Sequence, residues 1–241
     1  MTEMLRVENV SRRFGGLLAV NGASFAANAG CITALIGPNG AGKTTLFSII
    51  TGFLQPSDGR ICYEGADITG EPSHSLARRG IARTFQIAQP FTGLTVVENI
   101  AVGSHLARAK RADALAAAKD VAQAVGLGAM LDQPAASLTV AGRKRLELAR
   151  ALASRPKLLL LDEIAGGLTQ HECDDLVALI RRVQAAGVTI VWIEHVLHAL
   201  LSVVGRALVL HQGRFIADGD PRDVIRDPKV AEIYMGIETD A

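Results

Sequence analysis

Apolar residues form short runs and periodic stretches that predict alternating strands and helices. Continuous apolar runs at residues 31–36, 158–161 and 188–193 are typical of strands that are covered on both faces. Residues 170–186 carry apolar positions at helical spacing, and Gly187 is placed to end that helix. Strands that alternate with helices in this way predict a doubly wound α/β fold.

Further strands and one helix are predicted nearer the two ends of the chain. The strands are expected at residues 5–10, 17–26, 60–63, 207–211 and 214–217. Residues 43–51 have apolar positions at helical spacing, and Gln212-Gly213 is a turn signal that joins the last two strands in a hairpin.

The middle of the chain has a different pattern. Residues 95–106, 107–125 and 140–153 are rich in Ala, Leu, Arg and Lys, which favour helix, and their apolar positions recur every three or four residues. We therefore expect a mostly helical insertion within the α/β protein.

Composition narrows the possible functions. Of the 241 residues 49% are apolar, and 25 basic residues nearly balance 24 acidic ones. This argues against a disordered chain and against nucleic-acid binding through bulk charge. Cys31, Cys62 and Cys173 show no paired spacing, so we expect neither disulfides nor a zinc site and infer a reducing compartment. Because neither a signal peptide nor an apolar run of about 20 residues is evident, we expect any membrane role to come through a partner.

One segment matches the phosphate-loop pattern completely. It consists of Gly37, Pro38, Asn39, Gly40, Ala41, Gly42, Lys43 and Thr44, with Thr45 next in the chain. Glycines let backbone N–H groups surround phosphate oxygens, and the start of the following helix favours an anion. Lys43 can reach the β- and γ-phosphates, and the Thr44 hydroxyl can bind Mg²⁺. The alternative is a glycine-rich turn before an ordinary helix, which the strand and helix context disfavours.

Two carboxylates follow the strand predicted at residues 158–161, at the end where open α/β sheets bind their ligands. Asp162 is expected to hold Mg²⁺, directly or through water. Glu163 is expected to orient and deprotonate the water that attacks a nucleoside triphosphate. The alternative is an acidic pair that caps a turn, which the phosphate loop disfavours.

With these motifs the chain resembles the ATP-binding subunits of ABC transporters, and among them those of branched-chain amino acid importers. Further stretches that carry the resemblance are residues 13–20, 80–86, 94–100 and 193–195. The resemblance implies a P-loop NTPase fold with a RecA-like core, an antiparallel β subdomain and a helical subdomain. It places the core at about residues 1–86 and 156–241, and the helical subdomain at about residues 87–155.

The resemblance also implies roles for three further side chains. Phe14 corresponds to the aromatic residue that stacks on adenine, and Gln86 to the glutamine that reaches Mg²⁺ and the attacking water. His195 corresponds to the histidine that contacts the γ-phosphate. The alternatives are a core position for Phe14, an ordinary exposed position for Gln86, and half of a metal site for His195 with His198.

The family's signature, Leu-Ser-x-Gly followed by Gln or Glu, is altered in this chain. Thr139 stands in place of Ser, Ala141 in place of Gly and Gly142 in place of Gln or Glu. Shifting the register by one residue would restore the glycine but place Val140 at the hydroxyl position, so we keep the unshifted register. The methyl group of Ala141 is tolerated only where φ is negative and no phosphate crowds it. We therefore expect this segment to close less tightly over ATP.

The resemblance implies a subunit that hydrolyses ATP with Mg²⁺ to power an importer from the cytoplasmic face of the membrane. Its expected partners are a second ATPase subunit, identical or related, that pairs head to tail, transmembrane permease subunits and, indirectly, a substrate-binding protein, but no nucleic acid. Branched-chain amino acids are the expected solute. Amides, urea and organic acids remain alternatives, as do a weakly hydrolysing regulatory module and a soluble ABC ATPase of translation or DNA repair.

Contact with the permeases is expected in the segment after Gln86, roughly residues 87–100. An apolar group in this region consists of Phe85, Phe91, Leu94 and Val97. It either receives a short cytoplasmic helix of the permease or packs the helical insertion internally, and the sequence leaves both open.

We expect Ala141→Gly to raise both the ATPase rate and the nucleotide-driven pairing of subunits, because it removes a methyl group from the signature. Steady-state hydrolysis and size-exclusion chromatography with ATP measure the two effects. If neither changes, the expectation of a weakened closure is wrong.

Overall fold

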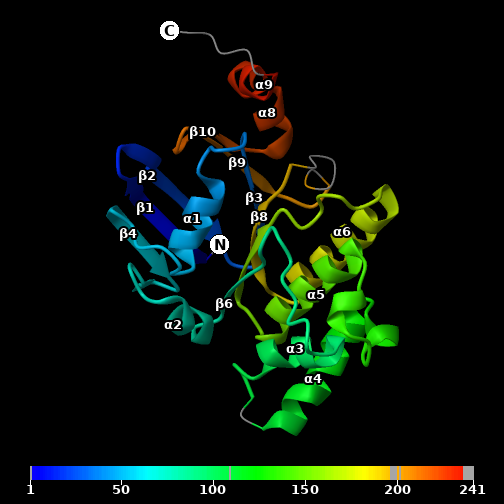
Figure 1. Ribbon diagram of the computed structural model, residues 1–241. Coiled ribbons are helices and arrows are strands. Elements are labelled where there is room, and N and C mark those ends of the chain that lie inside the picture. Colours follow the sequence, from blue (N-terminus) through cyan, green and yellow to red (C-terminus); the bar gives the residue numbers. More distant parts are fainter. Residues whose placement is uncertain (1, 109, 196–199, 201, 236–241) are drawn as a thin grey trace.

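The main sheet of the molecule has six strands in the order β10-β9-β3-β8-β7-β6 (Figure 1). The structure, a computed structural model, describes residues 2–108, 110–195, 200 and 202–235. The strands are β3 Ile32–Ile36, β6 Ile81–Arg83, β7 Leu158–Asp162, β8 Thr189–Ile193, β9 Arg206–His211 and β10 Arg214–Gly219. Neighbouring strands are parallel except for β9 and β10, which form the predicted hairpin. The prediction of an α/β fold is confirmed.

Both faces of the main sheet are buried, as its continuous apolar runs predicted. Successive side chains of a strand point to opposite faces. Leu159 and Leu161 of β7 therefore join one core cluster, and Leu158 and Leu160 join the other. Helices pack on the first face, whereas helix α1 (Lys43–Ile50) and a second sheet pack on the other.

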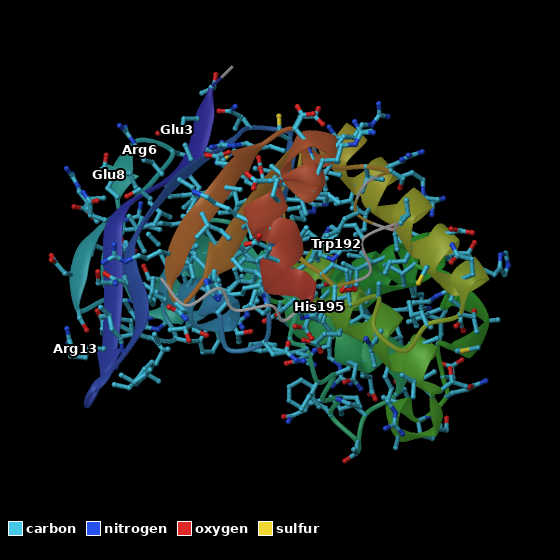
Figure 2. The ribbon with its side chains drawn as sticks, turned by 90° about the horizontal axis from the view of Figure 1, so that it is seen from above. Glu3, Arg6, Glu8, Arg13, Trp192 and His195 are labelled. Carbon is cyan, nitrogen blue, oxygen red and sulfur yellow. The ribbon has the colours of Figure 1, made fainter. Side chains whose placement is uncertain are left out.

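The second sheet is antiparallel, with the strand order β2-β1-β4-β5. Its strands are β1 Glu3–Phe14, β2 Leu17–Asn28, β4 Asp58–Tyr63 and β5 Ala66–Asp67. Along β1 an exposed guanidinium, that of Arg6, lies 2.9 Å from the Glu3 carboxylate and 3.5 Å from the Glu8 carboxylate (Figure 2). Strand β1 extends beyond the predicted residues 5–10 because irregularities in its pairing with β2 after Val7 break the alternation that predicts a strand.

The remaining helices cover the main sheet or form a cluster at one end of it. They are α2 Ser73–Arg78, α3 Val96–Ser104, α4 Arg111–Ala124, α5 Val140–Ala153, α6 Gln170–Ala185, α8 Pro221–Arg226 and α9 Pro228–Met235, with 3₁₀ turns at Gly128–Met130 and Ala135–Ser137. In Figure 1, α1 lies between the two sheets, and α3 and α4 pack beside α5. No helix in the described part of the chain is long and apolar enough to cross a membrane.

Two of the helices begin later in the chain than their periodicity predicted, because local hydrogen bonds fix where they start. The Thr95 hydroxyl accepts from the N–H of Glu98, and the Glu98 carboxylate accepts from the N–H of Thr95, so α3 begins one residue late. Helix α4 begins at Arg111 instead of residue 107, because the Ala107 N–H closes a turn with the Ser104 carbonyl.

Candidate nucleotide-binding site

The phosphate loop connects β3 to α1, and close backbone packing requires two of its glycines. A Cβ at Gly37 would collide with the carbonyl oxygen of Leu210, and a Cβ at Gly42 would collide with that of Ala19. Gly42 has a φ of +103°, which favours glycine. Among the described residues no side chain caps α1 and no acidic residue lies in its first turn, so the helix start favours an anion.

Lys43 is buried inside this loop. Its Nζ donates to the carbonyl oxygens of Gly37 and Pro38, at 2.8 and 2.9 Å. Burial lowers the pKa of Lys43, and the charges of Glu163 and Asp162 oppose this shift. The loop therefore carries a desolvated cation beside its N–H groups, an arrangement suited to phosphate oxygens.

Two cavities meet beside the loop. The first, of about 460 Å³, is lined by Phe14, residues 39–45, Gln86 and Glu163, among others. Phe14 is exposed, so its alternative as a core residue is wrong. The second cavity, of about 470 Å³, is lined by residues that include Thr44, Gln86 and Asp162. All three predicted Mg²⁺ ligands thus line one cavity, and two of them also line the first.

Asp162 ends β7 and is buried. Its Oδ2 accepts from a terminal nitrogen of Arg83 at 2.7 Å, whereas its Oδ1 is buried without a hydrogen-bond partner among the described residues. Burial raises the pKa of Asp162, and the hydrogen bond and charge of Arg83 oppose this rise. A carboxylate with one unpaired oxygen, on a residue that lines the same cavity as Thr44, fits a hard cation such as Mg²⁺.

Glu163 is held in an unusual conformation by its neighbours. Its φ is +50°, which costs a residue with a Cβ about 1–2 kcal/mol, and its N–H donates to the Ile193 carbonyl. Its Oε2 accepts from Gln86 Nε2 at 2.5 Å, and its Oε1 lies 2.8 Å from His195 Nε2. The structure thus brings the three predicted catalytic side chains into direct contact.

The rival metal site for His195 finds no support in the described part of the chain. His198, its proposed second ligand, lies outside the described residues. Within them, no group of three or more His, Cys, Asp and Glu side chains could hold a metal ion.

The signature residues lie at the start of α5, away from both cavities. The Thr139 hydroxyl accepts from the N–H of Gly142 at 3.2 Å and caps the helix, as the unshifted register requires. Ala141 lies in the first turn with a negative φ, so the first condition for its methyl group is met. None of the three residues lines either cavity, so they add nothing to the site within one subunit.

Two charged side chains beside the site, Lys144 (partly buried) and Glu194 (buried), were not singled out in the sequence. Lys144 of α5 donates to the carbonyl oxygens of Glu163 and Gly166, at 3.1 and 2.5 Å. Glu194, which directly follows β8, accepts from the N–H of Ala165 at 2.7 Å. Burial lowers the pKa of Lys144 and raises the pKa of Glu194 to about 7. The loop after β7 is thus held both from the helical insertion and from the neighbouring strand.

Comparison with known proteins gives relatives of the same length and family. The family model described as ABC transporter matches residues 20–166. The chain is 39% identical to the high-affinity branched-chain amino acid transport ATP-binding protein BraF of Pseudomonas aeruginosa, over 97% of this chain and 98% of that protein. It is 35% identical to the probable branched-chain amino acid transport ATP-binding protein LivG of Methanocaldococcus jannaschii, over 97% and 98%.

A solved structure shows the same fold. It is an ATP-binding cassette of an ABC transporter in its ADP conformation, similar with a TM-score of 0.89 and 34% identity over 98% of this chain and 100% of that one. The chain therefore belongs to the ABC transporter family. Its P-loop NTPase fold and its class, an ATP-hydrolysing cassette, are as the resemblance implied, and these predictions are confirmed.

We expect Glu194→Gln to change how stability depends on pH. Because the folded-state pKa of about 7 exceeds the ordinary 4.5, the stability that protonated Glu194 contributes is full below about pH 4.5 and is lost as the pH rises through 7. The variant keeps an acceptor for Ala165 but cannot ionise. Its unfolding free energy relative to wild type should therefore improve between pH 5 and 8, by at most about 3 kcal/mol.

Urea denaturation at both pH values measures this difference. Glu64→Gln, at an exposed ion pair with Lys157, serves as the matched control and should show little of the effect. An unfolding free energy of Glu194→Gln that tracks that of wild type across this range would contradict the account.

Proposed function

We propose that the chain is the ATP-hydrolysing subunit of an importer for branched-chain amino acids. The observation that carries this proposal is the single sheet edge on which the phosphate loop, Asp162 and the contacting trio of Gln86, Glu163 and His195 lie together. The solute follows from the two relatives, which are named for branched-chain amino acid transport and match over nearly their whole length.

In this proposal the loop binds the nucleotide. Phe14 stacks on the adenine, and the loop N–H groups and Lys43 bind the β- and γ-phosphates. Thr44, Gln86 and Asp162 hold Mg²⁺, which neutralises phosphate charge when bound. These ligands line one cavity next to the loop, which supports the assignment.

Glu163 is the proposed general base. It accepts a proton from water while the water oxygen bonds to the γ-phosphorus, and the bond from that phosphorus to the bridging oxygen breaks to give ADP and phosphate. Gln86 and His195 contact one carboxylate oxygen each, so they fix the direction in which Glu163 faces. His195, which contacts the Glu163 carboxylate, is proposed to contact the γ-phosphate as well.

A second subunit completes the site in this proposal. Thr139, Ala141 and Gly142 line neither cavity of their own subunit, and Thr139 is exposed at the start of α5. Head-to-tail pairing places that helix start over the γ-phosphate of the partner's ATP and excludes water from it. The partner is a copy of this chain or a related cassette.

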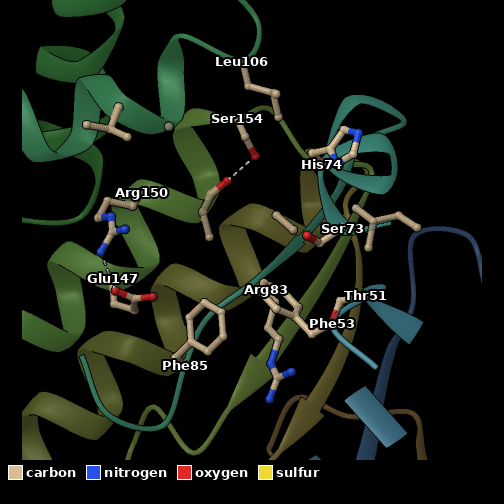
Figure 3. Close-up of a pocket in the computed structure, with 16 residues that line it drawn as sticks. Thr51, Phe53, Ser73, His74, Arg83, Phe85, Leu106, Glu147, Arg150 and Ser154 are labelled. Atoms are coloured by element: carbon tan, nitrogen blue, oxygen red, sulfur yellow. Dashed lines mark hydrogen bonds and ion pairs between the residues drawn. The ribbon is translucent and has the colours of Figure 1, made fainter. Parts of the chain in front are cut away.

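The permease contact is proposed for a groove between the core and the helical insertion. A cavity of about 300 Å³ lies there, with α2 and β6 on one side and α3 and α5 on the other (Figure 3). Exposed apolar side chains in its wall are Phe53, Phe85, Val102 and Leu106. A short apolar helix from the permease fits such a groove and would keep this subunit on the cytoplasmic face of the membrane.

The apolar group predicted from the sequence contains both exposed residues, which could dock a permease helix, and residues that pack the helical insertion internally. Phe85 and Phe91 are 42% and 46% exposed, and the Arg150 guanidinium lies 4.8 Å from the Phe91 ring. Leu94 is half-buried, and Val97 is only 7% exposed within the core. A docking role for Val97 is therefore wrong, whereas the two phenylalanines remain available to a partner.

We expect Glu163→Gln to lower ATP turnover by about 10²-fold or more while ATP binding stays intact, because the amide cannot accept the proton. Phosphate release and calorimetric ATP binding measure the two. A regulatory module that hardly hydrolyses ATP predicts no change in turnover, and that result would overturn the proposed mechanism.

We expect Phe53→Ala to weaken the affinity for the permease subunits by about tenfold or more, because the groove loses an exposed aromatic side chain that the permease helix would bury. The basal ATPase rate should not change. Ile216→Ala, at an exposed apolar position on β10, is the matched control. Equal affinities of the two variants in reconstituted membranes would argue against this groove as the contact.

A further inference from the structure

Arg83 is a buried arginine that joins the two chain segments expected to carry Mg²⁺. It ends β6, and its side chain is 5% exposed. One terminal nitrogen donates to Asp162 Oδ2 at 2.7 Å, and the other donates to Ser48 Oγ at 2.9 Å. Ser48 in turn donates to the carbonyl oxygen of Thr44 at 2.7 Å, one turn earlier in α1. A single guanidinium therefore spans from the strand of Asp162 to the helix of Thr44.

This contact decides which oxygen of Asp162 is available. Because Arg83 occupies Oδ2, the buried Oδ1 is the oxygen left without a partner among the described residues. The two terminal nitrogens of the guanidinium hold one partner each, Asp162 Oδ2 and Ser48 Oγ, which the single ammonium group of a lysine would not match. Asp162 itself lines the cavity that Thr44 and Gln86 also line.

Arg83 also lines the groove proposed for the permease. It belongs to the wall of both the groove and the cavity next to the phosphate loop, as do Phe85, Glu147 and Arg150. Its guanidinium lies 5.1 Å from the ring of Phe85, which contacts Phe53 edge to face at 5.5 Å (Figure 3). One side chain thus connects the groove wall to the carboxylate of Asp162.

We infer that Arg83 is a positioning residue for magnesium: its guanidinium holds Asp162 and the Thr44-bearing helix in one fixed arrangement, and it links that arrangement to the groove. The inference rests on the proposed function, since it takes Asp162 and Thr44 as Mg²⁺ ligands. Loss of a partner that orients a metal ligand typically costs 10- to 100-fold in metal affinity. ADP itself should bind as before without metal, because the phosphate loop is untouched.

The experiment measures Mn²⁺ binding to the ADP complex by electron paramagnetic resonance, and ADP binding in EDTA by calorimetry. Arg83→Met should weaken Mn²⁺ binding 10- to 100-fold and leave ADP binding in EDTA within twofold of wild type. Arg83→Lys keeps the charge but not the fork, so it should also lose Mn²⁺ affinity. Arg60→Met, at an exposed ion pair with Asp67, is the matched control and should bind both as wild type does.

The outcomes separate this inference from the proposed function. If wild type binds neither ADP nor Mn²⁺, the proposed function fails. Suppose that wild type binds both. If the Arg83 variants then bind Mn²⁺ as tightly as wild type does, or if their loss of ADP affinity in EDTA equals their loss of Mn²⁺ affinity, Arg83 is only a structural ion pair and the inference is wrong. Should Arg83→Met fail to fold, Arg83→Lys decides between these outcomes.

Discussion

The site depends on the parallel register of the main sheet, which brings four strand ends to one edge. Asp162 of β7 pairs with Ile193 of β8, and Ile193 also pairs with Leu35 of β3, immediately before the phosphate loop. Arg83, at the end of β6, pairs with Leu160 of β7. Because side chains alternate between the faces of a strand, a slip of one residue in any of these pairings would turn a site residue into the core.

This arrangement removes several charged side chains from water wholly or in part. Backbone groups supply hydrogen-bond partners for most of them. Lys43 and Lys144 donate to carbonyl oxygens of the two loops that form the site, and Glu194 accepts from a backbone N–H. Charges removed from water are tolerated only with such partners. The same contacts hold the loops in place, so the backbone groups that satisfy these charges belong to the loops that position Glu163.

The sequence predicted those parts of the fold and site that have strong local patterns. Buried parallel strands appear as apolar runs, and the phosphate loop and the pair Asp162-Glu163 follow such runs directly. Strand β6 has only three residues, too few to show a hydrophobic pattern. Strand β1 has one face in contact with solvent, so the hydrophobic pattern did not predict its full length. The capping pair Thr95 and Glu98 was visible in the sequence, and it would have placed the start of α3 correctly.

Contacts between distant segments could not be predicted from pattern. Arg83 and Asp162 are far apart in the chain, and Lys144 meets its carbonyl partners only because α5 packs beside β7. A charged residue beside a buried strand, such as Glu194, signals a buried site, but its partner depends on the fold. The packing of Val97 into the core was undecidable for the same reason.

Calorimetry of magnesium-ATP with the folded protein and with Lys43→Ala tests the central claim most directly, since the claim is that the loop, its lysine and Asp162 together bind a polyphosphate and its metal. Wild type should bind with a stoichiometry of one, and Lys43→Ala, folded to the same extent, should bind much more weakly and hydrolyse no ATP. Equal binding and hydrolysis by the two proteins would contradict the account.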